Sequence, residues 1–379
     1  MSESSENTAL PQPVKIRPSA PVEARPDPLP IPRDPLKGPV MKAFEIQNGF
    51  GLDHLTIAER SKPSPGRGQV LLRMRAVSLN FRDYLMVNGL YNPRQPLPLI
   101  PCSDGVGIVE EVGEDVERVA VGDRVITVFS QTWISGPPTK EKVRATLGGP
   151  LDGTLSEYMV VDQEGVSPAP EYLSDVEAAT LPCAAVTAWS ALVVHGKVKA
   201  GDTVLVQGTG GVSLFALQIA QTLGARVIVT SSKDAKLEKA VQMGAWKTIH
   251  YVDDPGWGKT AKQMTGGLGV DHIVDVGGAG TMEQSCRAVR IGGEISMIGV
   301  LGGAKVEMAL TPILMQNVRV QGILVGSREN LESMCKAFEL HELRPQVDRV
   351  FPFEEACEAF LYMAAGGHFG KICVDFADP

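Results

Sequence analysis

The chain has 379 residues, and its 36 Lys and Arg against 44 Asp and Glu give a formal net charge of −8 at pH 7. This acidic balance argues against nucleic acid or an anionic membrane as the main partner. A hydrophobic share of 44% excludes global disorder, and the length predicts two domains. The longest apolar runs, such as Ile295–Leu301, are far shorter than the ~20 residues that a membrane-spanning helix needs.

Residues 1–40 differ from the rest, because ten of the 27 prolines lie there and no hydrophobic period is present. Proline removes backbone hydrogen-bond donors, so this composition predicts a disordered, proline-rich tail. Met1 is followed by no apolar signal core. The six cysteines are scattered without a Cys-x-x-Cys pair, which is typical of reduced thiols. We therefore expect a cytoplasmic protein.

From Met41 onward, short β-strands dominate the pattern. Four runs have strand character and little helix between them: Met41–Ile46, Gln69–Val77, Gly105–Gly113 and Asp123–Val128. This spacing predicts a compact β-rich domain over residues 41–172.

From about Ser174 strands and helices alternate. Asp175–His195 predicts a helix that is interrupted near Pro182. The next elements up to residue 317 are Thr203–Gln207 (strand), Val212–Leu223 (helix), Arg226–Thr230 (strand), Ala235–Met243 (helix), Thr248–Tyr251 (strand), Val270–Val276 (strand), Thr281–Val289 (helix) and Glu294–Val300 (strand). This alternation predicts a parallel sheet covered on both faces. For residues 318–379 the local pattern fits either an extension of this sheet or a return to the first domain.

The most informative segment joins the strand Thr203–Gln207 to the helix that follows it. Six residues form a glycine-rich loop there: Gly208, Thr209, Gly210, Gly211, Val212 and Ser213. Glycines permit a tight turn and a close approach of the backbone to a pyrophosphate, and the free N–H groups at the helix start favour its negative charge. The strand before and the helix after favour this interpretation over a tight turn without a ligand.

The residues after the second strand indicate which dinucleotide binds. About 20 residues beyond the first glycine, a site for NAD needs Asp or Glu to accept from the ribose 2′-hydroxyl. Here Val229–Lys233 holds no acid, the first one is Asp234, and Lys236 follows. Hydroxyl and ammonium groups suit a 2′-phosphate, so we expect NADPH rather than NADH. In the alternative, Lys233 and Lys236 are only the solvated face of the next helix.

Several motifs stand in a recognisable order: Ala76–Asp83, Gly105–Val109, Val121–Val125, Leu181–Trp189, the glycine-rich loop and Gly370–Ile372. Through them the chain from about Met41 to Phe376 resembles the medium-chain dehydrogenase/reductase superfamily, in particular its quinone-oxidoreductase and zinc-free alcohol-dehydrogenase-like branches.

This resemblance implies an α/β protein with two domains. A GroES-like, β-rich catalytic domain would comprise residues 41–172 and be completed by residues 318–379. A Rossmann, doubly wound cofactor domain would comprise residues 173–317, with the active site between the two domains. The resemblance also implies a small-molecule substrate and a homodimer or homotetramer built on the edges of the cofactor-domain sheets.

The resemblance further assigns the cofactor contacts. Ser231, Lys236 and Tyr251 match positions that hold the 2′-phosphate in NADPH-using relatives, and Lys371 matches a basic residue near the pyrophosphate. Thr187 matches a threonine near the nicotinamide. We also expect Val300 beside the nicotinamide ring.

Zinc-dependent relatives hold their catalytic metal with a Cys, a His and a second Cys, and the matching positions here are Asn80, Ser103 and Cys183. Neutral oxygen groups are poor zinc ligands beside thiolate or imidazole. The segment 131–152, which matches the lobe for structural zinc, contains no cysteine. We therefore expect an enzyme without zinc.

Without a Lewis acid, an alkene or quinone conjugated to a carbonyl is easier to reduce than a simple ketone, because the charge delocalises as an enolate. Tyr91 matches a tyrosine proposed as the proton donor in related enoyl-thioester reductases, and Asn80 would donate to the carbonyl or orient the nicotinamide. The sequence thus predicts a zinc-independent, NADPH-dependent reductase of enones, enals or quinones. Two alternatives stay open: an NAD(P)-dependent alcohol dehydrogenase or ketone reductase, and a non-catalytic structural protein that binds NADPH.

Overall fold

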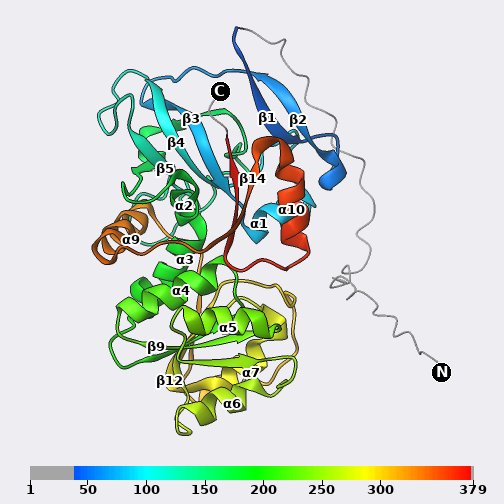
Figure 1. Cartoon of the computed structure of the whole chain (residues 1–379), viewed down its shortest axis with the longest axis vertical. Coiled ribbons are helices and arrows are strands. Elements are labelled where there is room, and N and C mark those ends of the chain that lie inside the picture. The colour runs from blue at the N-terminus through cyan, green and yellow to red at the C-terminus, as the bar shows by residue number, and fades with distance from the viewer. Residues whose placement is uncertain (1–37, 377–379) are drawn as a thin grey trace, which may run out of the picture.

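The computed structural model describes residues 38–376, so the predicted tail lies almost wholly outside the described residues. Two bodies lie one above the other, each built on its own sheet (Figure 1).

The first body is β-rich. Its seven-stranded sheet has the order β14-β15-β3-β4-β5-β7, with β6 also pairing with β3, and a separate antiparallel pair joins β1 to β2. The strands are β1 (Val40–Ile46), β2 (Leu55–Ser61), β3 (Gln69–Ser78), β4 (Asp104–Val112), β5 (Arg124–Thr127), β6 (Tyr158–Asp162), β7 (Val166–Pro168), β14 (Val347–Pro352) and β15 (Lys371–Asp375). The helices α1 (Phe81–Val87), α9 (Arg328–His341) and α10 (Ala356–Ala364) accompany them.

The last strand closes this sheet. Strand β15 runs antiparallel to β3, with Cys373 opposite Ser78 and Asp375 opposite Ala76. The last described strand therefore belongs to the same sheet as β3, in the first body.

The second body is a six-stranded sheet in the order β10-β9-β8-β11-β12-β13, and every neighbouring pair is parallel. Its strands are β8 (Thr203–Gln207), β9 (Arg226–Ser231), β10 (Lys247–His250), β11 (Val270–Asp275), β12 (Val289–Met297) and β13 (Arg319–Gly322). Its helices are α4 (Gly211–Thr222), α5 (Asp234–Gln242), α6 (Trp257–Met264), α7 (Met282–Ala288) and α8 (Thr311–Met315).

Both faces of this second sheet are covered. Along β8, Val204 and Val206 belong to the core on the side of α4, whereas Leu205 belongs to a separate core with Trp257 of α6. Successive strand side chains point to opposite faces, so a strand buried on both faces reads as a continuous apolar run. The predicted fold class, a GroES-like domain with a doubly wound parallel sheet, is confirmed.

Two details differ from the sequence-based prediction. Strand β13 pairs with β12, with Val320 opposite Ile295, so the six-stranded sheet extends past the expected boundary at residue 318. The local apolar pattern was compatible with either body, and the parallel pairing decides.

The connecting helix is the second difference, because it contains π-helical turns that the sequence does not predict. Within Asp175–His195, α2 (Asp175–Ala178) is followed by a turn at residues 179–180, a π-helical stretch at Leu181–Ala185, α3 (Val186–Trp189) and a second π-helical stretch at Ser190–His195, so the expected interruption lies just before Pro182. The wider π turn accommodates Pro182, which cannot donate a backbone hydrogen bond. The run is apolar enough to cross a membrane by composition, but 72% of its most apolar window is buried inside the molecule. It packs in a core that includes Val106 of the first body and Val204 of the second, as a core helix does.

Candidate active site

The glycine-rich loop leaves β8 and enters α4. Gly208 has a φ of 72°, a left-handed conformation that favours glycine, and its N–H donates to Thr230 O over 2.8 Å. An ideal Cβ built on Gly208 or Gly210 would meet no heavy atom within 4 Å. No side chain caps the first turn of α4. Open space beside the backbone and uncapped helical N–H groups fit a pyrophosphate.

The remaining loop residues are held in place by contacts within the protein, and their contacts with a cofactor stay predictions. A Cβ on Gly211 would lie 2.6 Å from Cδ of Lys371, so any other residue there would force the Lys371 side chain to shift. Ser213 Oγ donates to Gln207 O over 2.6 Å, and Val212 packs partly buried on the core. Thr209 O accepts the N–H of Gly370 over 2.9 Å, which attaches the loop to the first body.

The three residues predicted for the 2′-phosphate lie at the ends of neighbouring elements. Ser231 ends β9 and is buried, and Tyr251 follows β10 and donates its N–H to Ser231 O over 3.1 Å. Lys236 lies in α5, and its Nζ donates to Gly366 O over 3.0 Å. Burial lowers the pKa of Lys236, and the nearby Lys233 lowers it further. No carboxylate follows β9 before Asp234, so this corner suits a phosphate, and the contacts themselves stay predictions.

The predicted nicotinamide contacts come from two different elements. Thr187 is buried within α3, whereas Val300 is half exposed in the loop after β12. That loop packs tightly against the loop after β11, since Gly302 N donates to Gly277 O over 2.7 Å and Leu301 N to Val276 O over 3.2 Å. Their roles as cofactor contacts stay predictions.

Asn80 lies at the start of α1, in a hydrogen-bonded network. Asn80 Nδ2 donates to Ser103 Oγ over 3.5 Å, Ser103 Oγ donates to Asp104 Oδ1 over 2.8 Å, and Asp104 Oδ2 accepts the N–H of Cys183 over 3.3 Å. The three positions matched to the metal ligands of relatives therefore come together. Burial raises the pKa of the Asp104 carboxyl, although the charge of Lys371 lowers it in part. Burial also raises the pKa of the Cys183 thiol well above its usual range.

The same network contains a cation. Lys371 Nζ donates to Asn80 Oδ1 over 2.6 Å and to Leu79 O over 2.7 Å, and lies 3.9 Å from Asp104 Oδ2. Within residues 38–376, no three His, Cys, Asp or Glu side chains gather where they could hold a metal ion. One thiol, two neutral groups and one carboxylate already facing an ammonium do not fit a zinc site.

Tyr91, the predicted proton donor, is half exposed after α1. Beside it lies Arg82, whose guanidinium carbon is 5.0 Å from the centre of the Tyr91 ring and 5.0 Å from that of Phe129. Arg82 Nη1 donates to Leu147 O over 2.9 Å and Nη2 to Gly149 O over 3.1 Å, while its buried Nε has no hydrogen-bond partner.

Sequence reasoning did not single out Arg82. One signal was present, because a cation in the first turn of a helix opposes the helix dipole. The other partner of Arg82 is Asp83, 3.3 Å away, and burial raises the pKa of this carboxyl to about 6 although Arg82 lowers it.

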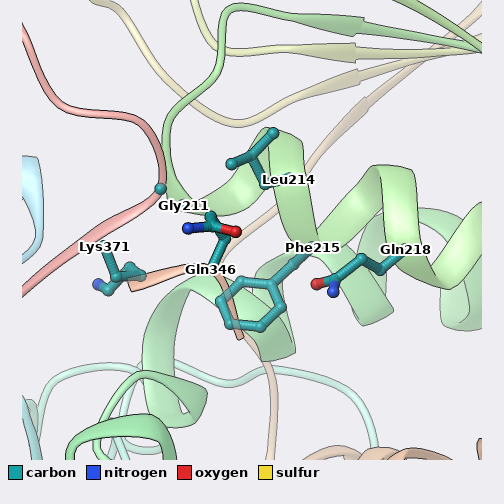
Figure 2. Close-up of a pocket in the computed structure, with 7 residues that line it drawn as sticks. Gly211, Leu214, Phe215, Gln218, Gln346 and Lys371 are labelled. Carbon is teal, nitrogen blue, oxygen red and sulfur yellow. The ribbon is translucent and has the colours of Figure 1, made fainter. Parts of the chain in front are cut away.

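A small pocket marks the junction of the two bodies (Figure 2). It has an empty volume of about 140 Å³ and is lined by Gly211, Leu214, Phe215, Gln218, Gln346, Gly370 and Lys371. Sites for drug-sized ligands usually measure ~300–1,000 Å³, so this pocket is a packing gap behind the glycine-rich loop.

Comparison with known proteins agrees with this arrangement. Residues 66–171 match the family described as the alcohol dehydrogenase GroES-like domain, and residues 211–339 match the family described as zinc-binding dehydrogenase. A zinc-type alcohol dehydrogenase-like protein of Schizosaccharomyces pombe is 43% identical over 85% of this chain and 95% of its own length.

A solved structure of a putative alcohol dehydrogenase from Sinorhizobium meliloti is also similar. It is 42% identical, has a TM-score of 0.83, and the match covers 90% of this chain and 100% of that one. An acryloyl-coenzyme A reductase of Sulfurisphaera tokodaii is 26% identical over 88% of this chain and 99% of its own length.

Proposed function

This chain belongs to the medium-chain dehydrogenase/reductase superfamily of oxidoreductases, and from that premise we propose that it is a zinc-independent, NADPH-dependent reductase. Its substrate is a carbonyl compound with a conjugated double bond, such as an enone, an enal or a quinone. The observation that carries the proposal is the network around Asn80. It brings the Lys371 ammonium together with the neutral donors Asn80 and Ser103, and among the described residues no three possible metal ligands gather.

The choice of NADPH rests on two features. The open space beside Gly208 and Gly210 suits a dinucleotide, and the residues at the end of β9 and beyond it suit a 2′-phosphate. The side chains after β9 are hydroxyls and ammonium groups, and a carboxylate that would repel a 2′-phosphate is missing from Ser231–Lys233. In this proposal Ser231, Lys236 and Tyr251 bind the phosphate, and the first turn of α4 faces the pyrophosphate.

NADPH, when bound, supplies a hydride to the β carbon of the substrate. Asn80 Nδ2, which donates to Ser103 Oγ in the structure, donates instead to the substrate carbonyl, where negative charge develops as an enolate. The Tyr91 hydroxyl then gives its proton to the α carbon, so hydride and proton together saturate the double bond. The guanidinium of Arg82, 5.0 Å from the Tyr91 ring centre, stabilises the tyrosinate that this transfer leaves.

The acryloyl-coenzyme A reductase supports this reaction class, since its name describes a double bond conjugated to a thioester carbonyl. The names of the other two relatives favour a second candidate, an NAD(P)-dependent alcohol dehydrogenase or ketone reductase. In that case Tyr91 or a bound water would protonate the alkoxide.

Substrate screening separates these candidates. The purified protein is assayed for oxidation of NADPH and NADH with 2-alkenals, enones and quinones, and for reduction of NADP⁺ and NAD⁺ with secondary alcohols. We expect turnover of conjugated carbonyls with NADPH. Turnover of alcohols and simple ketones alone would instead favour the dehydrogenase, and tight NADPH binding without any turnover would favour a structural role.

A second copy of this chain is the partner we propose. Strand β13 ends the six-stranded sheet, and the chain around it exposes large apolar side chains: Leu310, Leu314, Met315, Val320 and Leu324. Leu314 and Met315 are 77% and 73% exposed, which is unusual for such residues in contiguous sequence. Light scattering should give twice or four times the mass of the chain, and a monomer would refute this assignment. We also propose a cytoplasmic location, in keeping with the free cysteines.

A further inference from the structure

Lys371 is a buried cation at the junction of the two bodies. The residue is only 3% exposed. Its stem lies beside Gly211, and its amino group points away from α4 (Figure 2). The nearest oxygens to Nζ are Asn80 Oδ1 and Leu79 O, at 2.6 and 2.7 Å. Burying an ammonium is costly unless it is paired and hydrogen-bonded.

Its ion pair with the nearest carboxylate is long. The nearest carboxylate oxygen, Asp104 Oδ2, is 3.9 Å away and also accepts the Cys183 N–H. Asp104 itself is fully buried and accepts from Ser103 Oγ over 2.8 Å. Lys371, Asn80, Ser103 and Asp104 thus form a ring in which the positive charge faces the amide and the negative charge faces the hydroxyl.

We propose that the Lys371 ammonium is the built-in cation of this site: it takes the place of a metal ion and polarises the Asn80 amide. The inference rests on the zinc-independent reduction proposed above. Lys371 donates to the amide oxygen of Asn80 and so increases the positive charge on Nδ2–H, the group that donates to the substrate carbonyl in the proposed reaction. The same positive charge repels a divalent cation from Asp104 and Cys183.

The position of Lys371 in the chain couples this cation to the cofactor loop. Gly370, its neighbour, donates to Thr209 O over 2.9 Å and forms a β-bridge with Gly210. One short segment therefore fixes both the loop that would hold the dinucleotide and the charge on Asn80. This differs from the expected role of Lys371 at the pyrophosphate, because its amino group is already committed to Asn80 and Leu79.

The direct test is to build a zinc site around the cation and then remove the cation. Asn80→Cys and Ser103→His, with the native Cys183, would supply the two thiolates and one imidazole found in a Cys₂His zinc site. With Lys371 retained, we expect zinc to bind at least about a hundredfold more weakly than in the triple variant that also carries Lys371→Met. Affinity is measured by competition with a chromophoric chelator and stoichiometry by elemental analysis.

A matched control replaces another paired lysine. Lys62, which is hydrogen-bonded to Glu110 over 2.5 Å in the first body, is changed to Met in the Asn80→Cys, Ser103→His background and should leave zinc affinity unchanged. Equal zinc affinity with and without Lys371 would overturn the inference. So would a folded triple variant, judged by circular dichroism, that binds no zinc.

The single variants test the second half of the inference and avoid a redesigned site. Lys371→Met should lower kcat at least about tenfold, while the NADPH dissociation constant from fluorescence titration changes less than about threefold; Lys371→Arg should restore part of kcat. The opposite split, with weakened NADPH binding and unchanged kcat, would assign Lys371 to the pyrophosphate and overturn the inference. If the unaltered protein reduces no substrate, the proposed function fails, and the zinc titration still decides the role of Lys371.

Discussion

The glycine-rich loop and the network around Asn80 lie in adjoining parts of the molecule and are built in different ways. The loop is local: Gly208 and Gly210 follow their strand directly, and their function depends on backbone that has no side chain in front of it. The Asn80 network is assembled from distant segments, since Lys371 and Asn80 are 291 residues apart. One short stretch of sequence thus forms the proposed dinucleotide-binding loop, whereas the hydrogen bonds around Asn80 depend on how two distant segments of the first body pack together.

The largest effect is expected from removing the proposed proton donor, Tyr91, near the Asn80 network. Tyr91→Phe should lower kcat for a conjugated carbonyl by ~10²–10⁴-fold and leave NADPH affinity unchanged, because general acids contribute about that much. Half exposure of Tyr91 means that the loss of one hydroxyl should cost little stability. Stopped-flow measurement of NADPH oxidation gives the rate, and an unchanged rate on every accepted substrate would exclude Tyr91 as the acid.

The complementary change adds one methyl group to the local region. Gly210 has a φ of −81°, which any residue adopts, and a Cβ there meets no protein atom within 4 Å. Gly210→Ala should therefore keep the melting temperature within about 2 °C, yet weaken NADPH binding about a hundredfold, because the methyl group occupies the space of the pyrophosphate.

Gly256→Ala is the matched control, since its Cβ would make ordinary contact at 3.6 Å with Asp254 Oδ1, away from the loop. It should bind NADPH as the unaltered protein does. Normal NADPH affinity in Gly210→Ala would contradict the proposed dinucleotide-binding loop.

The stability of the protein should depend on pH through His368, which precedes Gly370 by two residues. Burial lowers the pKa of His368 from 6.5 to about 4, and Lys236 lowers it too. In the unfolded chain His368 binds a proton below pH 6.5, whereas in the folded protein it stays neutral down to about pH 4. The unfolded state is therefore favoured increasingly as the pH falls from 6.5 to about 4, and the free energy of unfolding decreases over that range. Between pH 7 and pH 5 this loss is about 2 kcal/mol.

His368→Asn should remove that loss. Urea unfolding of both proteins at the two pH values measures it, and His368→Asn should be less sensitive to acid than the unaltered protein. Equal acid sensitivity of the two proteins would show that His368 titrates normally in the folded state.

The smallest expected effect concerns the choice of cofactor. Lys236→Ala should weaken NADPH binding about tenfold and leave NADH binding unchanged, because only NADPH carries the 2′-phosphate. Lys239→Ala, one turn further along α5, serves as the control. If the unaltered protein used NADH with equal or better efficiency, the prediction of NADPH would be wrong.

Sequence reasoning succeeded where local pattern determines structure. Strand β8 was predicted with its observed bounds, and the helix after it begins one residue earlier than expected. The two sheets, and the glycine-rich loop with the first turn of α4, follow from alternation and glycine spacing. The boundary at residue 318 failed because Val320 fits either sheet, and only parallel pairing with Ile295 assigns it.

The candidate site was less accessible from sequence. Asn80, Ser103 and Cys183 were brought together by resemblance and do meet in space. The destination of the Lys371 amino group was not predictable, because it depends on how β15 is placed beside β3. Arg82 was missed since its significance lies in a buried Nε without a partner and in two aromatic neighbours, one of them Phe129 from a different loop.

The central claim is that hydride reaches a substrate polarised by protein groups alone. The most direct measurement determines zinc per chain by elemental analysis and follows NADPH-dependent reduction of an enone before and after dialysis against a chelator. We expect less than about 0.2 zinc per chain and the same kcat/KM after dialysis. About one zinc per chain, with activity lost on chelation and restored by the metal, would contradict the account.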